Sequence, residues 1–155
     1  MPAIITPDRD AVIAEIHIAA PPERVFQALT DRAEALQWGT SDLFQVFFWE
    51  MDVKPGGKWK FISRELTGKN AGREYEHHGE ILEMVPPRLL VYSWFANWHE
   101  PPTHRTVVRW ELTAMGNGTN LKLTHSGLKN LPGGCEGYSQ GWPGLLQELK
   151  NFVEK

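Results

Sequence analysis

Histidine has the widest chemical scope of the residues in this chain, because its side chain titrates near neutral pH and also ligates metals. His125 is in phase with Leu121 and Leu123, so we expect its ring on the apolar side of a strand. There it either bonds a nearby carbonyl or hydroxyl, or serves as the polar group that orients a ligand in a buried pocket. His125 is also the one weak candidate for a general acid or base.

The other histidines do not have metal-ligand spacing. His77 and His78 are adjacent on a predicted strand, so their rings point to opposite faces and cannot chelate one ion. His99 and His104 are five apart with two prolines between them, whereas a zinc-protease pair lies four apart on a helix. We therefore expect no metal site and no cofactor.

Nucleophiles and paired carboxylates are equally sparse. Cys135, the one cysteine, lies in a predicted glycine-rich loop without an obvious cationic partner, so we expect an unreactive thiol. Glu50, Asp52, Glu80 and Glu83 alternate on predicted strands and are expected on solvated faces. The sequence shows no nucleophile elbow, phosphate-binding glycine loop or recognisable catalytic triad.

Aromatic residues are the unusual part of the composition: seven Trp, seven Phe and three Tyr make up 11% of the chain. Alternation places many of them on shared strand faces, where they either fill the core or line an apolar ligand cavity. The candidate cavity residues are Trp38, Trp59, Phe61, Tyr92, Trp94, Trp98, Trp110, His125, Tyr138, Trp142 and Leu146. Of these, Trp38, Trp98, Tyr138 and Trp142 are expected to flank the mouth.

Length and charge narrow the function classes. The 155 residues fit a single globular domain, and 19 acidic against 16 basic residues give a net charge of −3. This balance offers no electrostatic footprint for nucleic acid or for an anionic membrane. Neither a membrane-spanning segment nor a secretory signal is predicted, so we expect a cytoplasmic protein.

The elements that must position these side chains follow from hydrophobic periodicity. We predict a strand at 11–18, short helices at about 20–29 and 32–38, and strands at 44–53, 58–66, 73–85, 88–97, 105–115 and 120–126. Hairpin-length connections between the strands predict antiparallel neighbours and an α+β fold.

The last segment has helical periodicity from Tyr138 to Glu154. Pro143 interrupts this pattern, and an interior proline costs about 3 kcal/mol. We therefore expect the long helix to begin near Trp142 or to kink there, with the turn around Tyr138 as a mobile lid.

Ordered motifs covering residues 11–155 resemble the START-like (SRPBCC) superfamily, in particular the branch of the activator of the heat-shock-protein-90 ATPase. The motifs are Ala20–Asp31, Pro55–Trp59, Gly79–Trp94, Val108–Leu112, Gly118–Leu128 and Gly141–Trp142. The resemblance implies a helix-grip fold, in which a bent antiparallel sheet wraps a long C-terminal helix and leaves a cavity between them.

Three function classes remain open, in decreasing order of preference. The first is a module that binds a small apolar or aromatic molecule in the cavity. The second is a chaperone-associated or stress-response protein, and the third is a cyclase- or hydrolase-type enzyme using His125. The expected oligomeric state is a monomer or a homodimer that pairs through edge strands.

Overall fold

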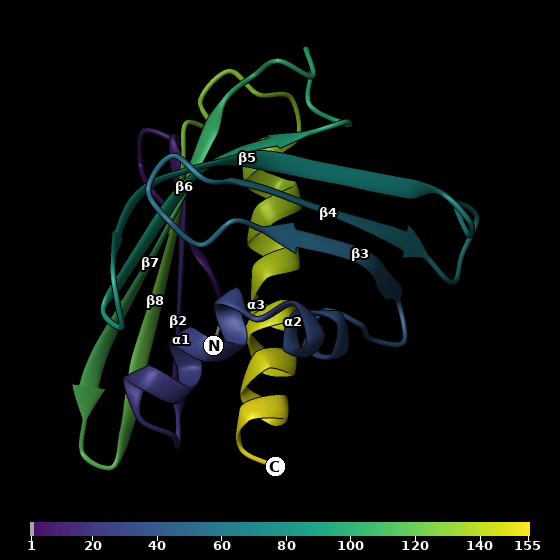
Figure 1. The fold of residues 1–155 in the computed structure, drawn as a ribbon. Helices are drawn as coiled ribbons and strands as arrows, with labels where there is room; N and C mark the ends of the chain where they lie inside the picture. The colour runs from purple at the N-terminus through teal and green to yellow at the C-terminus, as the bar shows by residue number, and fades with distance from the viewer. Residues whose placement is uncertain (1) are drawn as a thin grey trace.

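The computed structural model describes residues 2–155, which form eight strands and three helices (Figure 1). In chain order these are β1 Ile4–Ile5, β2 Ala11–Ile18, α1 Pro22–Thr30, α2 Arg32–Trp38, β3 Phe44–Met51, β4 Lys58–Glu65, β5 Glu74–Val85, β6 Leu89–Ala96, β7 Thr106–Met115, β8 Gly118–Ser126 and α3 Gly134–Val153. The predicted α+β class is confirmed.

The strands form one antiparallel sheet in the order β1-β2-β8-β7-β6-β5-β4-β3. Its register shifts between Val46 and Phe48 in β3, and between Ile81 and Glu83 in β5. Such irregularities bend a strand and increase its twist. Figure 1 shows the result: β3, β4 and β5, which we call the arm, run across the direction of β7 and β8.

Helix α3 lies on the concave face of this bent sheet, as the helix-grip expectation requires (Figure 1). It packs against β2 and β1 and against both short helices, while α2 packs on β3. Helix α1 begins with Pro22 in its first turn, where a missing N–H costs nothing, and the Asp31 carboxylate caps α2 by accepting from the Glu34 N–H at 3.0 Å.

The structure differs from the sequence analysis near both ends of the chain. The strand β1 is too short to show any periodicity and was not predicted. Helix α3 begins at Gly134 and continues through Pro143, so the expected start near Trp142 and the expected Tyr138 lid are wrong, while the alternative of a kink at Pro143 stays a prediction. Tyr138 and Trp142 are buried and hydrogen-bonded to the sheet, and this anchoring outweighs the roughly 3 kcal/mol cost of an interior proline.

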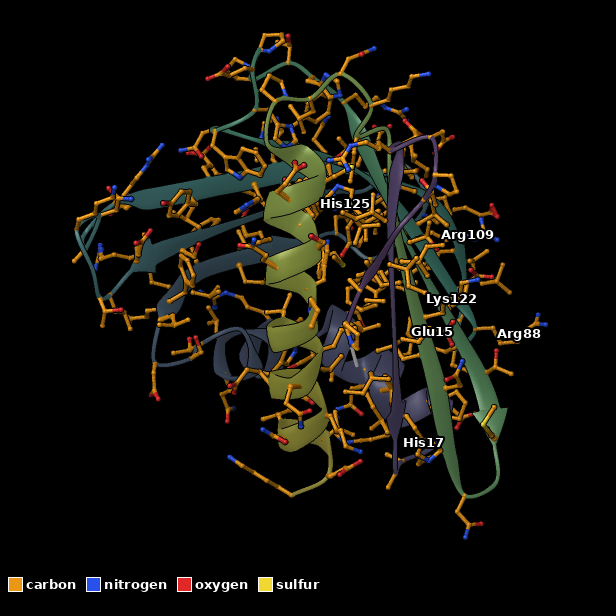
Figure 2. All side chains as sticks on the ribbon, turned by 180° about the vertical axis from the view of Figure 1, so that it is seen from behind. Glu15, His17, Arg88, Arg109, Lys122 and His125 are labelled. Carbon is orange, nitrogen blue, oxygen red and sulfur yellow. The ribbon has the colours of Figure 1, made fainter. Side chains whose placement is uncertain are left out.

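The predicted apolar strand faces are confirmed as the inner faces of the sheet. Trp59 on β4, Tyr92 and Trp94 on β6, and Trp110 on β7 are all buried. Figure 2 shows the opposite face of β2, β7 and β8, where charged side chains such as Lys122 project away from α3, whereas His125 points toward it.

Gly79 lies on β5 between β4 and β6, and its substitution tests how closely these three strands approach one another. A Cβ at this position would lie 1.8 Å from the Ser93 carbonyl oxygen and 2.7 Å from the Trp59 indole nitrogen. We expect Gly79→Ala to lower the free energy of unfolding by about 3 kcal/mol, since backbone cannot yield as a flexible side chain does. Gly141→Ala is the control, because a Cβ there meets no atom within 4 Å.

The control is expected to raise stability by about 0.5–1 kcal/mol, the usual gain of alanine over glycine within a helix. Urea unfolding measures both changes. A Gly79→Ala variant as stable as the parent would contradict the close approach of these strands.

Candidate functional site

The Trp94 indole is the centre of an aromatic cluster on the inner face. Its ring centroid lies 5.1 Å from that of Trp59, 5.6 Å from Phe61 and 5.4 Å from Trp142. It also contacts the rings of His77, His125, Tyr138 and Tyr92. The structure therefore brings most of the predicted cavity residues into one contiguous group.

Tyr138 links the cluster to the loop that follows β6. The Trp94 Nε1–H donates to the Tyr138 hydroxyl at 2.9 Å, and that hydroxyl lies 2.7 Å from His99 Nε2. His99 Nδ1 lies 3.0 Å from the His104 carbonyl, which accepts only, so Nδ1 carries the proton. In the neutral ring Nε2 is then the acceptor for the Tyr138 O–H.

His125 is fixed in the same way. The Trp142 Nε1–H donates to His125 Nδ1 at 3.0 Å, so the proton of the neutral ring lies on Nε2. Nε2 is 2.8 Å from the Thr106 hydroxyl, which in turn donates to the Trp94 carbonyl at 2.8 Å. Both nitrogens are engaged by the protein, which leaves neither of them for a proton transfer to substrate. Of the three roles that the sequence leaves open for His125, the structural one agrees with this geometry.

Burial keeps these imidazoles uncharged. Desolvation lowers the pKa of His77 to about 3, and it lowers the pKa of His125 well below its ordinary value. The pKa of His99 is lowered by the same cause. These three imidazoles therefore add no charge to the inner face at physiological pH.

The remaining predicted residues lie around this group rather than in it. Trp110 donates its N–H to the Tyr92 hydroxyl at 2.7 Å, and Leu146 lies on the buried side of α3. Trp38 is also buried and bonds the Ala28 carbonyl, so it closes the core between α1 and α2. Trp98 is half-buried against Tyr138, at a centroid distance of 5.1 Å.

One side of α3 carries three exposed glycines. Gly137, Gly141 and Gly144 share a face of the helix at spacings of four and three, and we call them the glycine face. A Cβ at Gly137 would approach the Trp98 ring to 3.7 Å, whereas at Gly141 or Gly144 it would meet nothing within 4 Å. Phe61 of the arm is correspondingly only half-buried.

Several inner-face residues were not predicted as part of the site. Thr106 and His99 carry the hydrogen bonds of the cluster, but only their tertiary partners reveal this. Trp49 and His77 lie on the inner face of the arm, both buried. Alternation was a usable signal for His77, whereas the register shift in β3 hides the orientation of Trp49.

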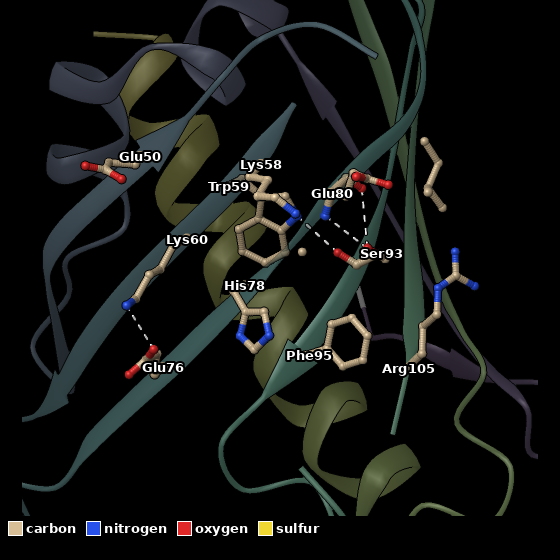
Figure 3. Close-up of a pocket in the computed structure, with 12 residues that line it drawn as sticks. Glu50, Lys58, Trp59, Lys60, Glu76, His78, Glu80, Ser93, Phe95 and Arg105 are labelled. Atoms are coloured by element: carbon tan, nitrogen blue, oxygen red, sulfur yellow. Dashed lines mark hydrogen bonds and ion pairs between the residues drawn. The ribbon is translucent and has the colours of Figure 1, made fainter. Parts of the chain in front are cut away.

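A hollow of about 670 Å³ lies on the opposite, outer face of the sheet (Figure 3). Its lining mixes charges of both signs, including a Lys60–Glu76 ion pair at 3.0 Å, and His78 stacks on Phe95. The predicted solvated carboxylates Glu50 and Glu80 also line it. The two histidines of the adjacent pair thus do face opposite sides of β5.

Cys135 lies in the first turn of α3, not in a loop as expected. It is buried, its thiol donates to the Arg9 carbonyl at 3.1 Å, and burial raises its pKa. Among residues 2–155, no three His, Cys, Asp or Glu side chains converge in a way that would hold a metal ion.

A comparison with protein families identifies the family of this chain. Residues 19–154 match the model of the activator of Hsp90 ATPase homolog 1-like proteins. The chain belongs to this family. The match spans the elements from the segment before α1 to the end of α3, and so includes the whole of the aromatic cluster.

Solved structures with the same fold come from several bacteria. A crystal structure of a Chromobacterium violaceum protein has a TM-score of 0.80 at 23% identity, over 94% of this chain and 99% of that one. The solution structure of an AHSA1-like protein from Aeromonas hydrophila has a TM-score of 0.74 at 19% identity, over 93% and 92%. CalU16 from Micromonospora echinospora has 0.67 at 22%, over 98% and 82%.

No curated protein sequence matches the chain. Among the described residues of this AHSA1-like domain, no helix combines the length and the apolar character that crossing a membrane would need.

The buried neutral His77 gives this domain a testable pH dependence. The unfolded chain binds a proton at His77 as pH falls through about 6.5, whereas the folded chain does so only near 3. The uncharged His77 ring therefore makes its full contribution to folding stability above pH 6.5, and that contribution is lost as pH falls. Relative to the parent, we expect the free energy of unfolding of His77→Phe to rise by about 1.4 kcal/mol for each pH unit below 6.5.

Urea unfolding at pH 7.5, 6.0 and 5.0 measures this difference. His78→Phe, on the outer face of the same strand, controls for the loss of an imidazole. Parallel pH profiles for the parent and His77→Phe would show that His77 is not held neutral by burial.

Proposed function

We propose that this chain binds a small, largely apolar molecule between the inner face of the arm and the glycine face of α3. The observation that carries the proposal is the row of aromatic rings on the inner face of the arm, where Phe61 is only half-buried. The exposed side of α3 that lacks side chains at Gly141 and Gly144 supports it, because a ligand there would meet no side chain of the helix. Concave, mostly apolar surfaces with a few polar groups are typical of small-molecule sites.

The hollow on the outer face supports this choice by contrast. Its charged lining and open shape suit contact with solvent, and its Lys60–Glu76 ion pair is a surface pair that contributes little to stability. An apolar ligand gains more from the inner face, where it would remove ring surface from water.

A thermal-shift screen tests the proposal with fatty acids, sterols, flavonoids and aromatic polyketides. A ligand present at a hundred times its Kd stabilises the folded state by roughly 2.7 kcal/mol. For a chain of this length we expect a rise in Tm of about 5–10 °C. A flat response across all four classes would contradict the proposal.

Gly141→Phe locates the site. A ring at this position would fill the space beside the glycine face, so we expect it to abolish the ligand-induced shift. Gly141→Ala adds only a methyl group to the same open space and is expected to retain binding. Unchanged binding by Gly141→Phe would place the ligand elsewhere.

A surface role related to chaperone activation is the second candidate, favoured by the family match alone. It predicts that the purified protein stimulates the ATPase of a heat-shock-protein-90 chaperone in a saturable titration. A flat titration would remove this candidate, and stimulation unaffected by Gly141→Phe would separate it from the ligand site.

A further inference from the structure

Three aromatic rings form a row across the inner face of the arm. Trp49 on β3 is paired with Phe61 on β4, and Phe61 is paired with His77 on β5. The Trp49 and Phe61 ring centroids are 5.5 Å apart with planes at 21°, and those of Phe61 and His77 are 4.3 Å apart at 17°. The row is therefore a nearly parallel stack that spans three strands.

Each end of this row carries a polar nitrogen without a partner. Trp49 Nε1 and His77 Nδ1 are buried and make no hydrogen bond within residues 2–155. The two side chains are only 7% and 8% exposed. A buried polar atom left unpaired is costly and rare, and it calls for an explanation such as a ligand or a water molecule.

The other buried indoles show that this arrangement is exceptional in this chain. Five tryptophans donate their N–H to protein acceptors, namely Trp38, Trp59, Trp94, Trp110 and Trp142. Trp49 is buried to a similar degree but donates to nothing. The fold thus supplies a hydrogen-bond acceptor for each buried indole except that of Trp49.

The electrostatics of the row restrict what its partner can be. An indole N–H only donates, so Trp49 needs an acceptor, whereas a neutral imidazole nitrogen either donates or accepts according to its tautomer. Of the three cations of β4, Lys60 and Arg64 pair with carboxylates of β5 and lie over the rings of Phe48 and Phe47 of β3, and Lys58 lines the hollow on the outer face. Arg73 stacks on Tyr75, whose hydroxyl bonds Glu65 at the far end of the arm.

We infer that the ligand of this site is a flat, uncharged aromatic molecule carrying a carbonyl or phenolic oxygen that hydrogen-bonds Trp49 Nε1 or His77 Nδ1. The inference rests on the proposed function and names its ligand class. A flat ring fits beside the stacked rings of the row, and its oxygen satisfies one of the nitrogens that the protein leaves unpaired. A carboxylate placed there would be buried without a countercharge, which is strongly unfavourable.

Four probes with the same two-ring skeleton test this inference by isothermal titration calorimetry: naphthalene, 2-acetonaphthone, 2-naphthol and 2-naphthoate. Acetonaphthone only accepts, naphthol both donates and accepts, and naphthoate is charged. We expect the two neutral oxygenated probes to bind about three- to tenfold more tightly than naphthalene, which is the net effect of a hydrogen bond. Naphthoate is expected to bind more weakly than naphthalene.

His77→Phe is the decisive variant, because it keeps a ring in the stack and removes an unpaired nitrogen. Its stability at neutral pH is expected to be unchanged or raised. We expect it to bind naphthalene like the parent and to lose part of the preference for 2-naphthol, with Trp49→Phe removing the preference for 2-acetonaphthone. His78→Phe, the control on the same strand, is expected to keep both preferences.

The outcomes distinguish a failure of this inference from a failure of the proposed function. Equal affinity for naphthalene and 2-naphthol in the parent would mean that water satisfies the nitrogens, and would overturn the inference while leaving the binding site intact. Tightest binding of 2-naphthoate, unaffected by His77→Phe, would overturn it in favour of an anionic ligand held near Arg73. Binding of none of the four probes would count against the proposed function itself.

Discussion

The contacts of one side chain, Trp94, join the arm of the bent sheet to the first half of the long helix. A sheet that bends encloses more volume than one helix fills, so large rings must span the remainder. Trp94 does this from β6, the strand next to the arm: its ring meets Phe61 of the arm and Trp142 of α3, and its N–H bonds Tyr138. Because such a ring is apolar except at one N–H, it fills the space and still requires an acceptor at a defined place.

This requirement explains why the core is rich in both indoles and hydroxyls. Tyr92, Tyr138 and the carbonyl groups of Ala28 and Ser93 serve as acceptors for four of the indoles, and His125 serves as acceptor for the fifth. The same bonds fix the tautomer of the His125 ring. Polar groups in this core thus position the aromatic rings, while Glu15, Arg109 and Lys122 of β2, β7 and β8 lie on the other face of the sheet (Figure 2).

Strand alternation was sufficient to predict the parts of the site that lie in regular strands. Tyr92, Trp94 and Trp110 were placed on the inner face from sequence, and the structure agrees. Alternation failed where the register shifts, because the bulge in β3 changes which residues face inward and thereby hides Trp49. It also does not reveal the partners of a side chain, so the bond between His99 and Tyr138, 39 residues apart, could not be foreseen.

The glycine face of α3 has a consequence for how the chain folds. Each interior glycine lowers helix propensity by roughly 1 kcal/mol relative to alanine, and Pro143 lowers it by about 3 kcal/mol more. The first half of α3 therefore has almost no tendency to form in isolation, since even favourable sequences of this length are marginal. Its helical order depends on rings already presented by the sheet. The glycine face thus makes the N-terminal turns of α3 depend on packing against the sheet for their helical shape.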